Sequence, residues 1–150
     1  MKLYERNIAL EWYQYGLEKQ DDFFMRFMMH WIAFNWLYSE YYDEDIKEHD
    51  AIESFCAINM KKLSQYDAFS SPFIEVFRNK PVGDRTGVRK IHRDRCNLLN
   101  QKNITALFLT IYQVRCNLFH GSKSIHNQRD IELVSSSAEI LGEYLKVLLT

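Results

Sequence analysis

The sequence predicts an all-α protein, folded as a single-domain helical bundle of about five main helices. Apolar residues recur at helical spacing through most of the chain, and no alternating run of apolar and polar residues is long enough for a strand. Hydrophobic residues make up 47% of the 150 residues, with only five Gly and two Pro, which favours a globular domain over a disordered chain. A chain of this length can bury roughly two-thirds of its unfolded surface. Residues 1–150 are therefore expected to form one domain.

The apolar periodicity places the main helices, with ends defined to roughly two to four residues. Acidic residues mark two of the helix starts, because carboxylates cap free N–H groups and face the positive end of the helix dipole. Asp22 is expected to cap the second helix, and the acidic trio Asp43 to Asp45 the third. The predicted helices are 4–19, 22–42, 44–65, 103–120 and 128–149.

Two C-terminal helices carry apolar stripes at the spacing of one helical face. In the first the stripe consists of Ile104, Leu107, Phe108, Ile111, Val114 and Leu118. In the second it consists of Ile131, Val134, Ala138, Leu141, Leu145 and Leu148. Consecutive helices with such stripes are expected to pack antiparallel.

Residues 66–102 are expected to be an irregular connection with one or two short helices, because Pro and Gly interrupt the periodicity. Residues 78–95 carry seven Lys and Arg against two Asp, a local charge of +5 within a chain of net charge −1. Clustered basic residues suit the phosphates of RNA, although a solvated basic loop explains them equally. The candidate RNA-binding residues here are Arg85, Arg89, Lys90, Arg93 and Arg95.

The cysteines and the apolar stretches predict a reduced, cytoplasmic protein. Cys56, Cys96 and Cys116 are odd in number and show no C-x-x-C spacing, so they are expected to be free thiols. The most apolar stretch, residues 23–42, is interrupted by charged and polar side chains, and no membrane span or membrane partner is expected.

Arg115 is the residue that the helical pattern does not explain. At about 100° per residue it falls between Phe108 and Leu118, on the apolar stripe of its helix. A guanidinium stays charged there, so it needs an acidic partner, a water-filled cleft or a subunit interface. The alternatives are a buried ion pair and a side chain that reaches solvent at the edge of the stripe.

His120 and Gly121 mark the end of the same helix. Glycine just past a helix terminus commonly adopts the left-handed conformation that ends it. His120 is therefore expected in the last turn, where the negative end of the dipole favours a protonated imidazole. In a regular helix it would point about 140° away from Arg115.

Two strings together resemble the HEPN superfamily, in its Apea-like branch. The first runs from Tyr112 to Lys123 and contains the motif Arg-x4-His at Arg115 and His120, with Gly121 after the histidine. The second, Trp31 to Tyr38, comes earlier, on a separate predicted helix. HEPN ribonucleases often have a polar residue directly after the arginine, whereas this chain has Cys116 there and Asn117 one position later.

The resemblance implies a metal-independent RNA endonuclease, without cofactors, in which two protomers of a homodimer bring Arg115 and His120 into one cleft. It implies a place in toxin–antitoxin or defence systems, with an antitoxin or other regulatory protein as a partner. Auxiliary polar roles would fall to Asn117, Cys116 and Asn35. Lys123 would hold a second phosphate, unless it is an ordinary exposed lysine, and Asn35 would otherwise be a satisfied core amide.

Two other functions stay open at this level. HEPN domains include non-catalytic modules that dimerise or bind a nucleotide or protein, and in such a module Arg115 and His120 would be structural. A helical structural protein without a site would explain the fold but not the arginine on an apolar stripe.

Overall fold

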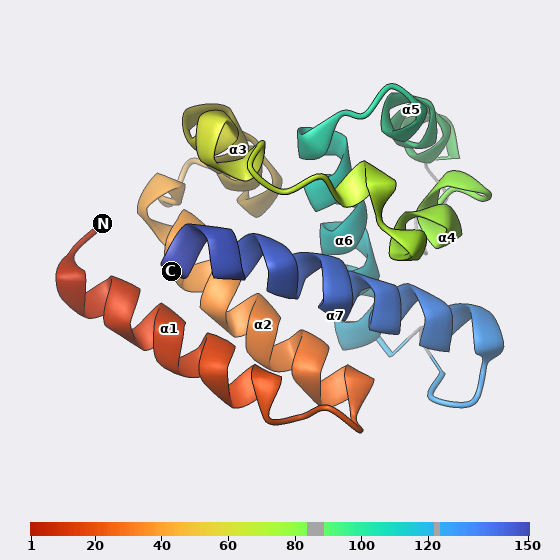
Figure 1. Ribbon diagram of the computed structural model, residues 1–150. Helices are drawn as coiled ribbons and strands as arrows, with labels where there is room; N and C mark the ends of the chain where they lie inside the picture. Colours follow the sequence, from red (N-terminus) through yellow and green to blue (C-terminus); the bar gives the residue numbers. More distant parts are fainter. Residues whose placement is uncertain (84–88, 122–123) are drawn as a thin grey trace.

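Every element in the described part of the chain is helical, which confirms the predicted all-α bundle. The computed structural model (Figure 1) describes residues 1–83, 89–121 and 124–150, without the side chains of residues 89 to 93. The α-helices are α1 (Leu3–Leu17), α2 (Phe23–Tyr38), α3 (Glu48–Leu63), α4 (Glu75–Arg78), α5 (Arg89–Asn100), α6 (Ile104–Phe119) and α7 (Gln128–Leu149). Short 3-10 helices cover Ser39–Tyr41, Ala68–Ser70 and Pro72–Ile74.

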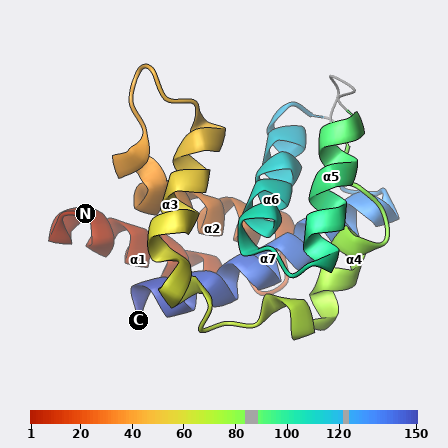
Figure 2. The same ribbon diagram turned by 90° about the horizontal axis from the view of Figure 1, so that it is seen from above.

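Helix α2 is the centre of the bundle, with α1 and α7 packed along it (Figure 1). Helices α3 and α6 pack on each other, and α5 packs on α6 (Figure 2). Two rows of helices result, one containing α1, α2 and α7 and the other α3, α6 and α5. The C-terminal end of α6 and the start of α3 lie in the second row.

The five predicted helices are present, with two boundary corrections. Helix α2 stops at Tyr38 and continues only as a 3-10 turn to Tyr41, short of the predicted residue 42. Asp22 caps it as predicted, accepting a hydrogen bond from the Met25 amide at 3.1 Å. The prediction for the third helix was wrong by four residues, because Asp43 instead closes a turn by accepting from the amides of Asp45 and Ile46.

The segment predicted to be irregular holds more helix than expected. Besides the short helices before residue 79, it contains α5, whose buried Leu99 and Cys96 face the core. The Cys96 thiol also contacts the Arg78 carbonyl oxygen at 3.2 Å, which ties α5 to the end of α4. The basic stretch therefore includes a regular helix.

Both C-terminal stripes are confirmed as core faces, with Val114, Leu141 and Leu145 fully buried. The predicted antiparallel pairing of these two helices was wrong. Helix α7 packs mainly along α2, and α6 crosses it steeply (Figure 2). The eight residues between α6 and α7 let α7 turn away to cover α2, which is apolar around most of its circumference.

Aromatic rings around Phe34 connect the two rows of helices. Its ring lies 5.3 Å from Trp31 and 4.8 Å from Tyr38 in α2, 5.4 Å from Phe55 in α3, and 5.1 Å from Phe108 in α6, measured between centroids. Offset and edge-on aromatic pairs of this kind add to the stabilisation from apolar burial alone.

The cysteines and the helix compositions agree with the sequence expectations. All three cysteines are free, and Cys56 and Cys96 are buried. Burial raises the pKa of the Cys56 thiol to about 12, so it stays protonated. Within the described ranges, none of the helices combines the length and apolar content needed to cross a membrane.

His30 is a histidine buried in the core, only 1% exposed, between α1 and α7. A Cβ added at Gly16 would lie 2.6 Å from its Nδ1, and one added at Gly142 would lie 3.1 Å from its Nε2. Glycine at both positions lets the two helices close on the imidazole. Burial, and then the nearby charge of Arg26, lower the pKa of His30 from 6.5 to about 4.

We expect His30 to make the protein less stable in mild acid. The unfolded chain takes up a proton on His30 below pH 6.5, whereas the folded protein does so only near pH 4. The free energy of unfolding should therefore fall by about 3 kcal/mol between these two values. Denaturant unfolding across this range should show the loss in the wild type and in a His126→Phe control. It should be largely absent in His30→Phe, and an equal loss in that variant would contradict the assignment.

Candidate functional site

Arg115 lies on the third-last turn position of α6, half-buried between two aromatic rings. Its guanidinium carbon is 5.7 Å from the Trp31 ring centroid and 4.7 Å from that of Phe119. One guanidinium nitrogen, Nη1, donates a hydrogen bond to the carboxylate of Glu48 at 3.3 Å. The buried Nε has no hydrogen-bond partner among the residues that the structure describes.

Glu48 is the acidic partner that the apolar position of Arg115 requires. It is the first residue of α3, where a carboxylate also faces the positive end of the helix dipole. The Tyr38 hydroxyl donates to one of its oxygens at 2.5 Å, and the Tyr112 hydroxyl donates to the other at 3.4 Å. Four residues from α2, α3 and α6 thus form one polar cluster, which we call the Glu48–Arg115 cluster: Tyr38, Glu48, Tyr112 and Arg115.

The two tyrosines of this cluster are held in the neutral form. Burial, followed by the hydrogen bond to Glu48 and its negative charge, raises the pKa of Tyr38 well above its usual range. Burial and the hydrogen bond with Cys116, followed by the charge of Glu48, raise the pKa of Tyr112 as well. Both hydroxyls therefore act as hydrogen-bond donors that hold the Glu48 carboxylate.

His120 ends α6, as the sequence predicts. It is exposed, and its amide donates to the Cys116 carbonyl oxygen at 3.0 Å. Gly121 follows with φ +71°, the left-handed conformation expected of a glycine just past a helix terminus. The exposed imidazole and the half-buried guanidinium therefore belong to the same helix end but to different depths of the protein.

Asn117 and Cys116 have structural positions near this end of α6. Asn117 is buried, donating to the Gly83 carbonyl oxygen at 2.6 Å and accepting from Gln113 at 2.9 Å. It therefore fixes the point where the chain approaches the basic stretch. Cys116 is half-buried beside Tyr112.

Asn35 does not belong to the cluster. Its side chain is exposed, so the expectation of a buried or cleft-lining amide was wrong. The stripe of Met28, Ile32 and Asn35 is the outer edge of α2, because the helix turns its Phe27, Phe34 and Tyr38 side to the core. Trp31, in the same string, is the residue that reaches Arg115.

The predicted RNA-binding residues are only partly within the described structure. Arg85 and Lys123 lie outside the described residues, as do the side chains of Arg89, Lys90 and Arg93. Arg95 is half-buried and lines a cavity of about 10 Å³ between α5 and α6. The packing of α5 on α6 nevertheless brings the backbone of the basic stretch beside the helix that carries Arg115 and His120.

One group with the composition of a metal site follows Glu48 on α3. Possible ligand atoms of His49, Asp50 and Glu53 lie within 4.8 Å of one another. The His49 imidazole pairs with Glu53 at 3.0 Å, and both acids are exposed. Acids in the first turn of a helix are accounted for by the helix dipole.

The sequence could not have identified Glu48, Tyr38 or Tyr112 as partners of Arg115. Glu48 is 67 positions away, and nothing in its local pattern distinguishes it from other acids at a helix start. Tyr112 carries a weak signal, since it lies three positions before Arg115 on the same helix.

Comparisons of this chain with known protein families, with curated proteins and with solved structures give no match. The resemblance to HEPN domains therefore rests on the two strings around Trp31 and Arg115, and on the helical fold that contains them.

We expect Glu48→Gln to lower the free energy of unfolding by about 1–3 kcal/mol. The pair is only partly exposed, so the cost lies between the limits for exposed and buried ion pairs. The amide can still accept a hydrogen bond from Tyr38, which leaves the Arg115 charge as the main loss. Denaturant unfolding of Glu48→Gln, of Arg115→Met and of the double variant measures the coupling. An exposed acid in the preceding loop provides the control, Glu44→Gln. Additive effects of the two substitutions would contradict a direct interaction.

Proposed function

We propose that this chain is a metal-independent RNA endonuclease that works as a homodimer. The observation that supports this most is the state of Arg115. It is a half-buried arginine with one nitrogen on a carboxylate and Nε without a described partner, at the helix end that also carries an exposed histidine. Arginine and histidine are the two residue types that cleavage of RNA without a metal needs.

The chemistry divides between these two side chains. A guanidinium can hold a phosphate and stabilise the additional negative charge of a pentacovalent transition state. An imidazole that titrates near neutrality can accept the proton of the ribose 2′-hydroxyl or give a proton to the leaving 5′-oxygen. The 2′-oxygen attacks the phosphorus and the bond to the 5′-oxygen breaks, leaving a 2′,3′-cyclic phosphate. DNA lacks the 2′-hydroxyl and is not a substrate.

The homodimer follows from the different directions of the two residues on one helix. Five positions on a regular helix separate them by about 140°, so Arg115 of one subunit meets His120 of a second more easily across a two-fold axis. Two apolar side chains near this helix end are available for such an interface, since Phe119 is 49% and Ile125 62% exposed.

The Glu48–Arg115 cluster also favours a second candidate function. An arginine whose charge is already matched by Glu48 can be purely structural, and the protein would then be a non-catalytic module that dimerises or binds a nucleotide or protein. The nuclease proposal requires that a phosphate shares or takes over the guanidinium that Glu48 holds.

We expect His120→Ala to slow cleavage by ~10²–10⁴-fold, because the substitution removes a proton-transfer group. RNA affinity should change little, since the imidazole is not the main phosphate ligand. Single-turnover cleavage of labelled single-stranded RNA in excess chelator measures the rate, with matched DNA alongside. The matched control is His126→Ala, an exposed histidine six positions later. Cleavage by His120→Ala at the wild-type rate would support the binding module instead.

We expect the interface to include the exposed apolar residues near the end of α6. Replacing Phe119 and Ile125 with serine should weaken the dimer in sedimentation experiments at about tens of micromolar, because both side chains lose apolar surface to bury. The control is Ile58→Ser, which removes a side chain that is 68% exposed on α3. A wild-type protein that remains monomeric would contradict the proposed assembly.

A further inference from the structure

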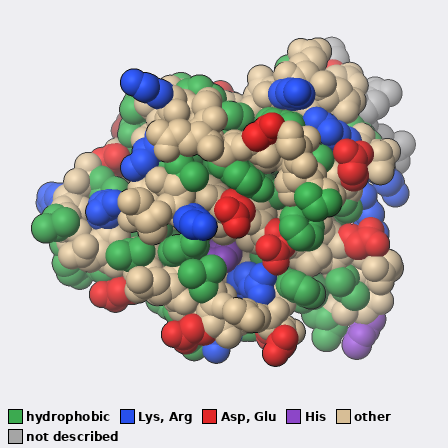
Figure 3. Space-filling model, in the orientation of Figure 1, with side chains coloured by type: hydrophobic (Ala, Val, Ile, Leu, Met, Phe, Trp, Pro, Cys, Tyr) green, Lys and Arg blue, Asp and Glu red, His purple; other side chains and the backbone are tan. Residues whose placement is uncertain are grey.

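Two neighbouring pockets share Glu139 and Glu143 of α7, and neither contains a residue of the Glu48–Arg115 cluster. The wider pocket has a volume of about 350 Å³ and lies between α7 and residues 66–73. The smaller, of about 60 Å³, lies between α1, α2 and α7. Figure 3 shows acidic side chains near the middle of this face, among apolar ones.

The wider pocket combines acidic and aromatic walls. Asp67, Glu139 and Glu143 line it together with Tyr66 and Phe73. Phe73 is 40% exposed, so its ring is accessible. Burial, and the negative charges of these three carboxylates, raise the pKa of Tyr66, with a hydrogen bond to Ser71 opposing them. Carboxylates beside aromatic rings attract organic cations through charge and through the ring faces.

The smaller pocket contains an unsatisfied polar side chain. His30 lines it, is 1% exposed, and its Nδ1 has no hydrogen-bond partner among the described residues. The imidazole is neutral near pH 7, and a neutral imidazole has one nitrogen that accepts a hydrogen bond. Tyr13 lines the same pocket.

The positive charge of Arg26 in the smaller pocket is already matched. Its guanidinium donates to Glu139 at 2.6 Å and to the carbonyl oxygens of Lys19 at 3.2 Å and Gln20 at 2.7 Å. Glu143 and Asp67 remain in the two pockets without a salt bridge to a described cation. The lining residues therefore carry a net negative charge.

We propose that these two pockets bind a small linear diamine, with one ammonium group beside Phe73, Tyr66 and Glu143 and the other reaching the pocket lined by His30. Each ammonium group brings the donors and the positive charge that the carboxylates and the neutral imidazole can accept. The apolar chain between the ammonium groups lies against α7. This binding does not depend on the nuclease proposal.

Calorimetric titration with putrescine tests the proposal on the full chain. Putrescine should bind saturably, whereas butane-1,4-diol, which has the same length without charge, should not. Butylamine should bind more weakly, because it fills only one of the two pockets. A lysine-rich peptide that saturates where putrescine does not bind would overturn the proposal.

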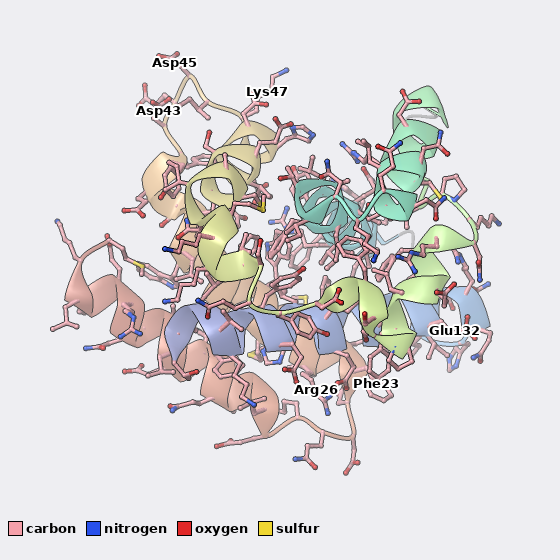
Figure 4. The ribbon with its side chains drawn as sticks, turned by 45° about the horizontal axis from the view of Figure 1, so that its top comes forward. Phe23, Arg26, Asp43, Asp45, Lys47 and Glu132 are labelled. Atoms are coloured by element: carbon pink, nitrogen blue, oxygen red, sulfur yellow. The ribbon has the colours of Figure 1, made fainter. Side chains whose placement is uncertain are left out.

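Matched variants locate the site. Glu143→Gln should weaken putrescine binding by about threefold to fivefold, as expected for one partly exposed charge pair. Phe73→Leu should also weaken it, because the aromatic face is lost while apolar surface stays. The control is Glu132→Gln, the same change at an exposed acid of α7. Figure 4 shows Glu132 at the far end of α7 from Arg26.

The imidazole signals of His30 in an NMR titration give an independent readout. They should shift with the same affinity as the calorimetric binding, since the second ammonium group lies beside this ring. Unchanged His30 signals, equal affinity for butylamine, or an equal loss in Glu132→Gln would each overturn the proposal.

Discussion

The aromatic contacts around Phe34 are the interaction on which the rest of the structure depends. One ring touches partners in α2, α3 and α6, and Phe108 carries the contact on to Tyr144 of α7 at 4.7 Å. The residues on either side of Phe34 in α2 have polar consequences. Trp31, one turn earlier, lies against Arg115, and Tyr38, one turn later, holds Glu48. The core therefore determines where the ion pair of α3 and α6 can form.

The residues that the sequence identified and those it missed differ in the range of the interaction involved. The stripes of α6 and α7, the Asp22 cap and the left-handed Gly121 depend on residues within a few positions of each other, and periodicity or capping rules predict them. The need of Arg115 for a charged partner was also predictable. Its partner was not, because Glu48 meets it only through the packing of α3 on α6.

Two errors have the same physical origin. Asn35 was assigned to a buried stripe because Met28 and Ile32 share its face, but α2 is apolar on nearly all sides and its exposed edge is decided by which neighbours cover it. Helix α7 was paired with α6 because both are amphipathic and consecutive. It packs on α2 instead, since α2 offers more apolar surface, and helix propensity cannot choose between such partners.

The account makes the Glu48–Arg115 pair a competitor of RNA, because the same guanidinium is proposed to bind phosphate. This competition can be measured as the affinity for single-stranded RNA of the wild type and of Glu48→Gln, each in chelator, with and without Arg115→Met. Release of Arg115 should raise the affinity of Glu48→Gln by roughly threefold, the effect of one partly exposed ion pair. The increase should vanish when Arg115 is replaced by Met. An unchanged affinity, or the same increase in both backgrounds, would contradict the proposal that Arg115 binds the phosphate of RNA.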